Sequence, residues 1–388
     1  MQSTCSRDVS IFRVKIDTFW EYVDEVDMSN WKADKPHNNL PLLPPKEEVE
    51  AREVWKACVE ARAAIAGVKQ ACGLLPNPGI LINTIPLLEA QASSEIENIV
   101  TTTDKLFLYA NTQEKADKET QEALRYRAAL YTGIKLLKKK PFCVQTAIDI
   151  CREIKGIDLN IRKTPGTKLI NDSTGKVIYT PPEGEELLRE LLSNWERYAH
   201  AKDDVDPLIK MAVLHYQFEA IHPFIDGNGR TGRVLNLLYL IEVGLLNEPI
   251  LYLSGYINRN RTKYYEGLIG VTAKGNWTGW ISFILQGIQE TAEWTTSLVE
   301  SINKLIQSNA KKVRKEKPNI YSKELIEAIF VQPYCRINDL IALDIAKRET
   351  ASNYLKALCD LHLLKEIQFG REKVFINSQL ISLMKSSL

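Results

Sequence analysis

Twelve consecutive residues in the second half of the chain combine the residue types that phosphoryl transfer needs. His222 can accept a proton near neutral pH, and Asp226 is a carboxylate of the kind that binds Mg²⁺. Arg230 and Arg233 are three residues apart, so on a helix they share a face and present two guanidinium groups suited to phosphate. Together these groups predict phosphoryl-transfer chemistry. The segment reads His222-Pro223-Phe224-Ile225-Asp226-Gly227-Asn228-Gly229-Arg230-Thr231-Gly232-Arg233.

The same segment predicts a helix, a tight turn and a second helix. The residue before a proline avoids the helical conformation, so the first helix is expected to end near His222. The glycines of Asp226-Gly227-Asn228-Gly229 remove the steric barrier to unusual backbone dihedrals. From Arg230 the pattern is helical again. The turn therefore lies at a helix N-terminus, where free backbone N–H groups and the helix dipole favour an anion.

At every specified position the segment resembles the core motif of the Fic family, H-P-F-x-(D/E)-G-N-(G/K)-R-x-x-R. The resemblance extends over residues 40 to 295. It implies a protein adenylyltransferase, in which AMP passes from ATP to a Ser, Thr or Tyr hydroxyl of a target protein or of the chain itself. Pyrophosphate would be released. Gly229 favours AMP transfer, because phosphotransferring relatives typically have Lys at that position.

The resemblance also implies a role for each site residue. His222 would take the proton from the target hydroxyl, and Asp226 would hold Mg²⁺ on the α- and β-phosphates. Arg233 would reach the γ-phosphate, and Tyr265 matches a position that contacts adenosine. The implied ATP-binding set is Glu97, Phe224, Ile225, Asp226, Gly227, Asn228, Gly229, Arg230, Arg233 and Tyr265.

A second motif, Ser93-Ser94-Glu95-Ile96-Glu97-Asn98, resembles the inhibitory signature of the family, (S/T)-x-x-x-E-(G/N). The resemblance implies that Glu97 pairs with Arg233 and so misaligns the bound ATP. Misplacing a reacting group by about 1 Å can cost about a hundredfold in rate. From spacing alone, Glu97 could equally be one more exposed helix carboxylate.

Helical periodicity dominates the chain, so we expect a mainly α fold with a small β-hairpin flap and a C-terminal winged helix-turn-helix domain. The family resemblance implies that the hairpin, at 168–179, binds the target segment as an added strand. The Pro-rich stretch before Pro45 should be extended and lie over the folded body. The expected divisions are an N-terminal arm and inhibitory helix (1–110), the catalytic core (111–300), a charged linker (301–318) and the winged helix (319–388).

Composition limits the remaining alternatives. The 388-residue chain has a net charge of +1, which gives no general argument for nucleic acid or an anionic membrane. Seven cysteines include no C-x-x-C pair, and neither a signal peptide nor an apolar run of about 18 residues is evident. We therefore expect reduced thiols, no membrane segment and a cytoplasmic protein.

Two other classes of function stay open from the sequence. One is a Fic-type enzyme with another outcome, such as phosphoryl transfer, transfer of another nucleotide or removal of AMP. The other is an ATP-sensing regulator whose tail binds DNA. The tail from 319 to 388 has nine Lys and Arg against eight Asp and Glu, so we favour protein docking over DNA. A homodimer is expected only by resemblance.

Overall fold

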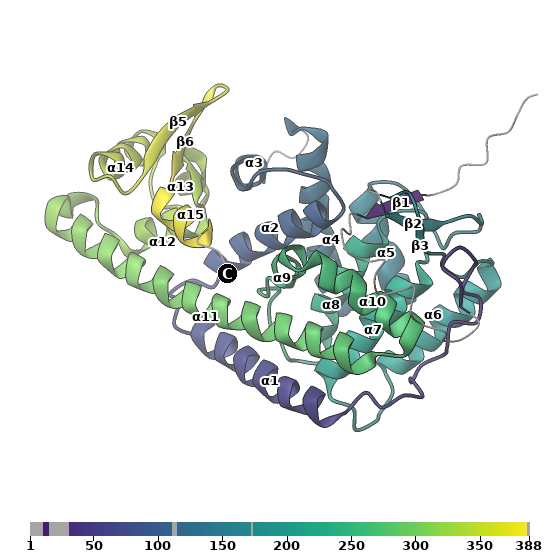
Figure 1. Cartoon of the computed structure of the whole chain (residues 1–388). Coiled ribbons are helices and arrows are strands. Elements are labelled where there is room, and N and C mark those ends of the chain that lie inside the picture. The colour runs from purple at the N-terminus through teal and green to yellow at the C-terminus, as the bar shows by residue number, and fades with distance from the viewer. Residues whose placement is uncertain (1–10, 15–30, 111–114, 172–173, 386–388) are drawn as a thin grey trace, which may run out of the picture.

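The structure, a computed structural model, describes residues 11–14, 31–110, 115–171 and 174–385. It is mainly helical, with two small three-stranded sheets in the described part (Figure 1). This confirms the expected fold class. Among the described residues, no helix has both the length and the apolar character required to cross a membrane.

Eleven helices between residues 52 and 316 form the body of the molecule in the described part of the chain. The two that flank the predicted loop, α7 and α8, are buried on almost every face, as expected for helices at the centre of a large core. The helices are α1 Arg52–Cys72, α2 Gly79–Ile96, α3 Thr103–Tyr109, α4 Lys118–Leu137, α5 Val144–Lys155, α6 Glu185–Ala199, α7 Pro207–Ile221, α8 Asn228–Glu242, α9 Leu253–Arg259, α10 Arg261–Lys274 and α11 Trp277–Glu316.

The hairpin predicted at 168–179 is present. Strand β2 (Lys168–Asn171) pairs antiparallel with β3 (Val177–Tyr179), and residues 172 and 173 of its turn lie outside the described residues. A short strand not expected from the sequence, β1 (Ile11–Val14), runs parallel to β2 on its other edge. Within the described chain β2 is therefore the central strand of this sheet.

The Pro-rich stretch before Pro45 lies on the body, as expected. The backbone N–H of Leu43 donates to Oδ1 of Asn194 (2.7 Å), and Nδ2 of Asn194 donates back to the Leu43 carbonyl (2.8 Å). Gln217 of α7 donates to the carbonyl of Pro41 (2.9 Å). Side-chain amides of the core thus satisfy backbone groups of the extended arm. Residues 1–10 and 15–30 of the predicted arm lie outside the described residues.

The predicted linker at 301–318 is helical instead. Helix α11 runs without interruption from Trp277 to Glu316, and Ile306, Asn309 and Val313 are buried along one side. The basic residues at 311–317 that suggested a linker lie mostly on the exposed side of this helix. Composition predicted a linker here because the charged run hid a helical pattern of buried positions.

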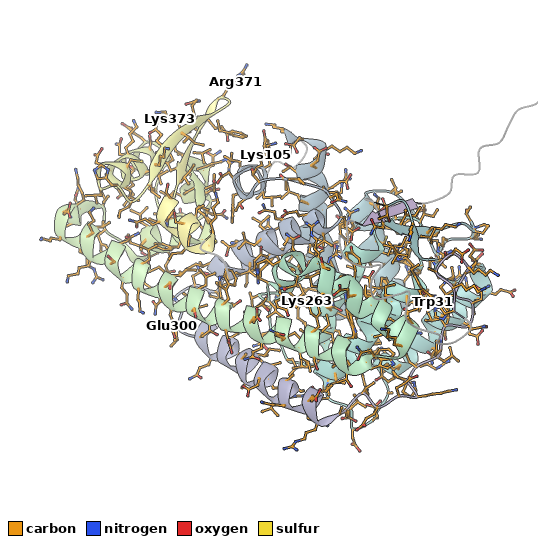
Figure 2. The ribbon with its side chains drawn as sticks, in the orientation of Figure 1. Trp31, Lys105, Lys263, Glu300, Arg371 and Lys373 are labelled. Atoms are coloured by element: carbon orange, nitrogen blue, oxygen red, sulfur yellow. The ribbon has the colours of Figure 1, made fainter. Side chains whose placement is uncertain are left out.

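The C-terminal residues form a compact unit at the far end of α11 (Figure 1). Its order of three helices and a hairpin is compatible with the predicted winged helix, and Figure 2 shows Arg371 at the hairpin tip, directed away from the body. Strand β4 and helix α15 were not predicted. The elements are η3 Pro318–Ile320, α12 Lys323–Val331, β4 Tyr334–Arg336, α13 Ile337–Ala342, α14 Arg348–Asp360, β5 Lys365–Phe369, β6 Glu372–Ile376 and α15 Ser378–Lys385.

This C-terminal unit contacts α3, the helix that follows α2. The ring of Tyr334 stacks on Phe107 with centroids 5.6 Å apart, and its hydroxyl donates to Asp104. The guanidinium of Arg336 donates to the carbonyl of Leu108 (2.7 Å). The unit is thereby attached both through α11 and through α3.

A proline substitution near the end of α11 tests whether the helix continues through residue 316. We expect Lys311→Pro to lower the free energy of unfolding by about 3 kcal/mol, because it removes a helical hydrogen bond and clashes with the preceding turn. Lys311 is exposed, so Lys311→Ala should stay within about 0.5 kcal/mol of the parent. Chemical denaturation monitored by circular dichroism measures both. A proline tolerated as well as alanine would indicate a flexible linker.

Candidate active site

The imidazole of His222 lies where α7 ends. Its backbone N–H donates to the carbonyl of Phe218 (3.0 Å), and its φ of 50° is left-handed, which stops the helix. Nδ1 of the ring is 3.3 Å from the carbonyl oxygen of Glu219. A carbonyl can only accept, so Nδ1 carries the hydrogen and Nε2 is the basic nitrogen. The expected helix end at His222 is confirmed.

Burial, and after it the charge of Arg162, lowers the pKa of His222 to about 4. The ring is therefore neutral at pH 7 and able to accept a proton. Since the side chain also lines the large cavity described below, His222 combines the protonation state and the location that a general base needs.

Arg162 holds this helix end in place. It is buried, and its Nε donates to the carbonyl of His222 (2.8 Å) while NH2 donates to the carbonyls of Pro182 and Ile221. A cation at a helix C-terminus satisfies the last carbonyls and favours the dipole. The sequence analysis missed Arg162, because nothing in its neighbourhood indicates a contact 60 residues away.

Asn228 fixes the loop between α7 and α8. Its Oδ1 accepts from the N–H of Phe224 (2.8 Å), and its Nδ2 donates to the carbonyl of the same residue (2.8 Å). Gly227, with φ of 86°, precedes the helix. The N–H of Thr231 makes the first helical bond, to Gly227 (2.9 Å), so the three preceding N–H groups have no acceptor within the helix. They form the expected anion-binding helix end.

Asp226 projects from this loop and is half-exposed. One of its oxygens pairs with Nζ of Lys155, and the other lies 4.0 Å from NH2 of Arg230. Burial opposes ionisation, but the Lys155 hydrogen bond and charge outweigh it and keep the pKa of Asp226 below its usual value.

An ionised carboxylate beside an anion site fits Mg²⁺ that arrives with phosphates. The described residues contain no cluster of three or more His, Cys, Asp or Glu that could hold a metal. Mg²⁺ commonly uses one or two carboxylates and completes its shell with water and substrate phosphate. Asp226 would therefore hold the ion jointly with the nucleotide.

The guanidinium of Arg233 is almost fully buried and joins α8 to α2. Its NH2 donates to Oε1 of Glu97 (2.8 Å) and to the carbonyl of Ser93 (2.9 Å), and its Nε donates to Oγ of Ser93 (2.8 Å). Only 3% of Arg233 is exposed. The structure thus brings together Glu97 and Arg233, which lie 136 residues apart, and adds Ser93, the first residue of the inhibitory signature, as a further partner.

Gly229 makes room for this pair. A Cβ at Gly229 would lie 2.3 Å from Oε1 of Glu97 and 2.9 Å from NH1 of Arg233. Both distances are shorter than a carbon contact allows, so a larger residue would displace the carboxylate. The Glu97 carboxylate therefore lies over the first turn of α8, at the predicted anion site.

A cavity of about 670 Å³ opens over this helix end, within the size range of small-molecule sites. Strands β2 and β3 contribute Leu169 and Ile178 to one wall. Phe224 and Gly227 do not line the cavity: Phe224 is buried beneath the loop against Phe218, and Gly227 faces Lys155. The predicted residues that line it are Glu97, His222, Ile225, Asp226, Asn228, Gly229, Arg230, Arg233 and Tyr265.

Among the lining residues that the sequence analysis missed, two pair with residues of the predicted set. Glu122 of α4 pairs with Arg230 (3.2 Å), and Lys155 of α5 pairs with Asp226. Each is one charged residue among many on an amphipathic helix, so periodicity alone could not distinguish it. His215 of α7 is a core residue: it is buried, stacks on Trp280 and contacts the hydroxyl of Tyr264 (3.0 Å).

Three family models match the chain. The model described as Fic/DOC family matches residues 141–240, and the model described as Fic/DOC family N-terminal matches residues 55–135. The third, described as protein adenylyltransferase SoFic-like, C-terminal domain, matches residues 305–380. The matches cover α2, the C-terminal unit and the cavity lining except for the residues of α10.

Individual proteins with Fic or adenylyltransferase names are also similar to parts of the chain. A Drosophila virilis protein named protein adenylyltransferase Fic is 25% identical over 269 residues, which are 67% of this chain and 51% of that protein. A probable protein adenylyltransferase of Aquifex aeolicus is 40% identical over 88 residues, 23% of this chain and 24% of that protein. The chain therefore spans about half or less of the length of these curated relatives.

Solved structures share the fold. A Fic family protein from Desulfovibrio desulfuricans superposes with a TM-score of 0.51 at 19% identity, covering 82% of this chain and 95% of that one. A Fic domain containing signaling protein from Bacteroides thetaiotaomicron gives the same TM-score and identity over 63% of this chain and 97% of that one.

The contact between Arg162 and the end of α7 predicts how His222 titrates. We expect Arg162→Gln to raise the pKa of His222 from about 4 toward 6.5, because the substitution removes a nearby positive charge and lets water reach the ring. An NMR titration of the histidine C–H signals, with His222→Ala for assignment, measures this. Arg152→Gln is the matched control, since Arg152 also donates to a backbone carbonyl, that of Leu159. An unchanged His222 titration in Arg162→Gln would contradict the prediction.

Proposed function

Because the chain belongs to the Fic/DOC family, we propose that it is a protein adenylyltransferase that moves AMP from ATP to a Ser, Thr or Tyr hydroxyl of a protein. The observation that carries this proposal is the location of His222, together with the contact between its Nδ1 and the carbonyl of Glu219. Its basic Nε2 belongs to a ring that lines the same cavity as Arg230, Arg233 and the N-terminus of α8. The names of the relatives agree with this chemistry.

The proposed reaction forms one bond and breaks one. The hydroxyl oxygen of the target attacks the α-phosphorus of ATP, and the bond from that phosphorus to the oxygen bridging to the β-phosphate breaks. Pyrophosphate leaves. The hydroxyl proton passes to Nε2 of His222, which is neutral at pH 7. Mg²⁺ held by Asp226 would neutralise phosphate charge.

The N-terminus of α8 supplies the electrostatic part of the proposal. Backbone N–H groups of Asn228, Gly229 and Arg230 lack helical acceptors, and the buried guanidinium of Arg230 adds a fixed positive charge. Donors fixed before the reaction cost no reorganisation as charge develops on the phosphate oxygens. The turn is rigid because the Asn228 side chain accepts from the N–H of Phe224 and donates to the carbonyl of the same residue.

Target binding is proposed to involve the edge of β2. The resemblance implied a target segment added to the hairpin as a strand, but residues 11–14 of the chain already pair with that edge. A target strand at this place would therefore have to displace β1. Strand addition relies on main-chain hydrogen bonds, so recognition of particular targets would need a second surface, and we propose the C-terminal unit for that role.

The Glu97–Arg233 pair is proposed to keep the enzyme inhibited. Glu97 occupies the guanidinium that would otherwise bind the γ-phosphate, and its carboxylate lies over Gly229. A triphosphate that enters beside Glu97 is repelled by this carboxylate, at the place where its γ-phosphate would need the free guanidinium of Arg233. ATP would then bind with its α-phosphorus away from the line of attack.

Removing the inhibitory carboxylate should activate the enzyme. We expect Glu97→Gly to raise incorporation of AMP into protein by about a hundredfold, the cost of a misplacement of about 1 Å. Glu95→Gly is the matched control, because Glu95 lies on the same helix but contacts Asn258 and not Arg233. Adding His222→Ala to Glu97→Gly should abolish incorporation. Equal rates in Glu97→Gly and the parent would contradict the proposed inhibition.

The position of the label distinguishes AMP transfer from phosphoryl transfer. With Glu97→Gly, protein should become labelled from α-³²P-ATP and not from γ-³²P-ATP, because the bond to the β-phosphate breaks and pyrophosphate carries the γ-phosphate away. Gel autoradiography and mass spectrometry of the modified protein measure this. Labelling from the γ-position alone would replace the proposal with phosphoryl transfer.

A further inference from the structure

Four acidic side chains line the cavity, and three of them have a cationic partner. The pairs are Glu97 with Arg233, Glu122 with Arg230, and Asp226 with Lys155. The fourth, Glu219, makes no ion pair within 4 Å in the described part of the chain. Its Oε1 is buried and has no hydrogen-bond partner among the described residues. Buried oxygens of this kind are uncommon and call for an explanation.

The carboxyl group of Glu219 fits where it does because the residue opposite it, Gly232, has no side chain. A Cβ at Gly232 would lie 2.4 Å from Oε1 of Glu219, and 3.3 Å from Cδ1 of Phe218. The carboxyl therefore lies directly against α8 at Gly232. Gly232 comes one residue before Arg233 and about one helical turn after Gly229. The two glycines of α8 thus each face a carboxyl group: Gly229 faces Glu97, and Gly232 faces Glu219.

Charged and titratable groups surround Glu219 on several elements. Burial raises its pKa to about 8, with Arg233 lowering it and Glu97 raising it. Glu219 therefore carries a proton at pH 7 while Glu97 is in place. The groups around it are Arg233 on α8, Glu97 at the end of α2, Tyr264 and Tyr265 on α10, and His215 and His222 next to it along α7.

Withdrawal of Glu97 would leave Arg233 without a carboxylate. Ser93 would still accept from Nε and NH2, but neither acceptor carries charge. A buried guanidinium whose ionic partner has gone is strongly unfavourable. Loss of Glu97 also removes the negative charge that disfavours ionisation of Glu219. Both effects favour a negative charge on Glu219.

We propose that Glu219 is a positioning residue for Arg233, neutral while Glu97 pairs with the guanidinium and ionised, as its replacement partner, once Glu97 withdraws. On withdrawal the proton passes from Glu219 to water. When a triphosphate enters and its own charge meets Arg233, Glu219 takes a proton back from water. This inference rests on the proposed function, because it assumes that the cavity binds ATP and that Glu97 leaves.

Proton uptake on nucleotide binding tests this exchange without measuring AMP transfer. The full chain is titrated with α,β-methylene-ATP and Mg²⁺ at pH 7.5 by calorimetry, in two buffers with different ionisation enthalpies. Glu97→Gly should take up a fraction of a proton that Glu97→Gly/Glu219→Gln does not. Protonation of the nucleotide itself and competition for Mg²⁺ are common to both proteins and cancel in the difference.

Controls separate this role from a merely structural one. Glu97→Gly/Glu95→Gln should show the uptake of Glu97→Gly, because Glu95 does not line the cavity. If the Glu219→Gln protein does not fold, Glu97→Gly is compared with the parent, in which Glu219 already holds its proton. The affinity of Glu97→Gly for the analogue should then weaken more steeply as pH rises, by at most tenfold per pH unit for one proton.

The outcomes distinguish the inference from the proposed function. Binding with equal proton uptake in Glu97→Gly and Glu97→Gly/Glu219→Gln overturns the role of Glu219 and leaves the proposed function intact. No binding of the analogue to any of the proteins overturns the proposed function, and the inference with it. Uptake that disappears only with Glu219→Gln supports the inference.

Discussion

The buried charge of Arg233 is the interaction on which the arrangement of this molecule depends. An arginine with 3% of its surface exposed must be paired, and the hydrogen bonds of its guanidinium reach Ser93 of α2 and Glu97 at the end of that helix. Removing one partner of a buried pair typically costs about 3–5 kcal/mol. The pairing therefore holds the C-terminal end of α2 beside the cavity. One contact thus links two helices and sets the charge that the site presents.

The rest of the site is fixed mainly by contacts to backbone atoms. Arg162 binds the last carbonyls of α7, and Asn228 binds the loop at Phe224. Backbone groups cannot change rotamer, so such contacts hold a catalytic loop more closely than side-chain pairs would. The first two turns of α8 present glycines instead of side chains where carboxyl groups approach. Rigid support and local space together explain how several acidic groups coexist beside an anion site.

The sequence correctly predicted those features of the site that neighbouring residues determine. The helix end at His222, the glycine turn and the following helix depend on local dihedral preferences, and all were confirmed. Glu97 was found only through resemblance, since its partner is distant in sequence. Composition did not reveal that α11 continues through the charged run, because this continuation depends on buried positions such as Asn309 and Val313. Residues brought to the site by packing gave no local signal; they are Glu122, Lys155, Arg162 and Glu219.

Because Glu97 is part of the same chain as Arg233, it has an effective concentration at the guanidinium that geometry alone sets. Dilution of the protein does not change it, and neither does the amount expressed. In the proposed function ATP thus competes with a carboxylate whose effective concentration at Arg233 is constant. The fraction of active molecules would depend on how often the end of α2 opens, which is a property of local helix stability. Any partner or substitution that changes that opening equilibrium would adjust activity without touching the reacting atoms.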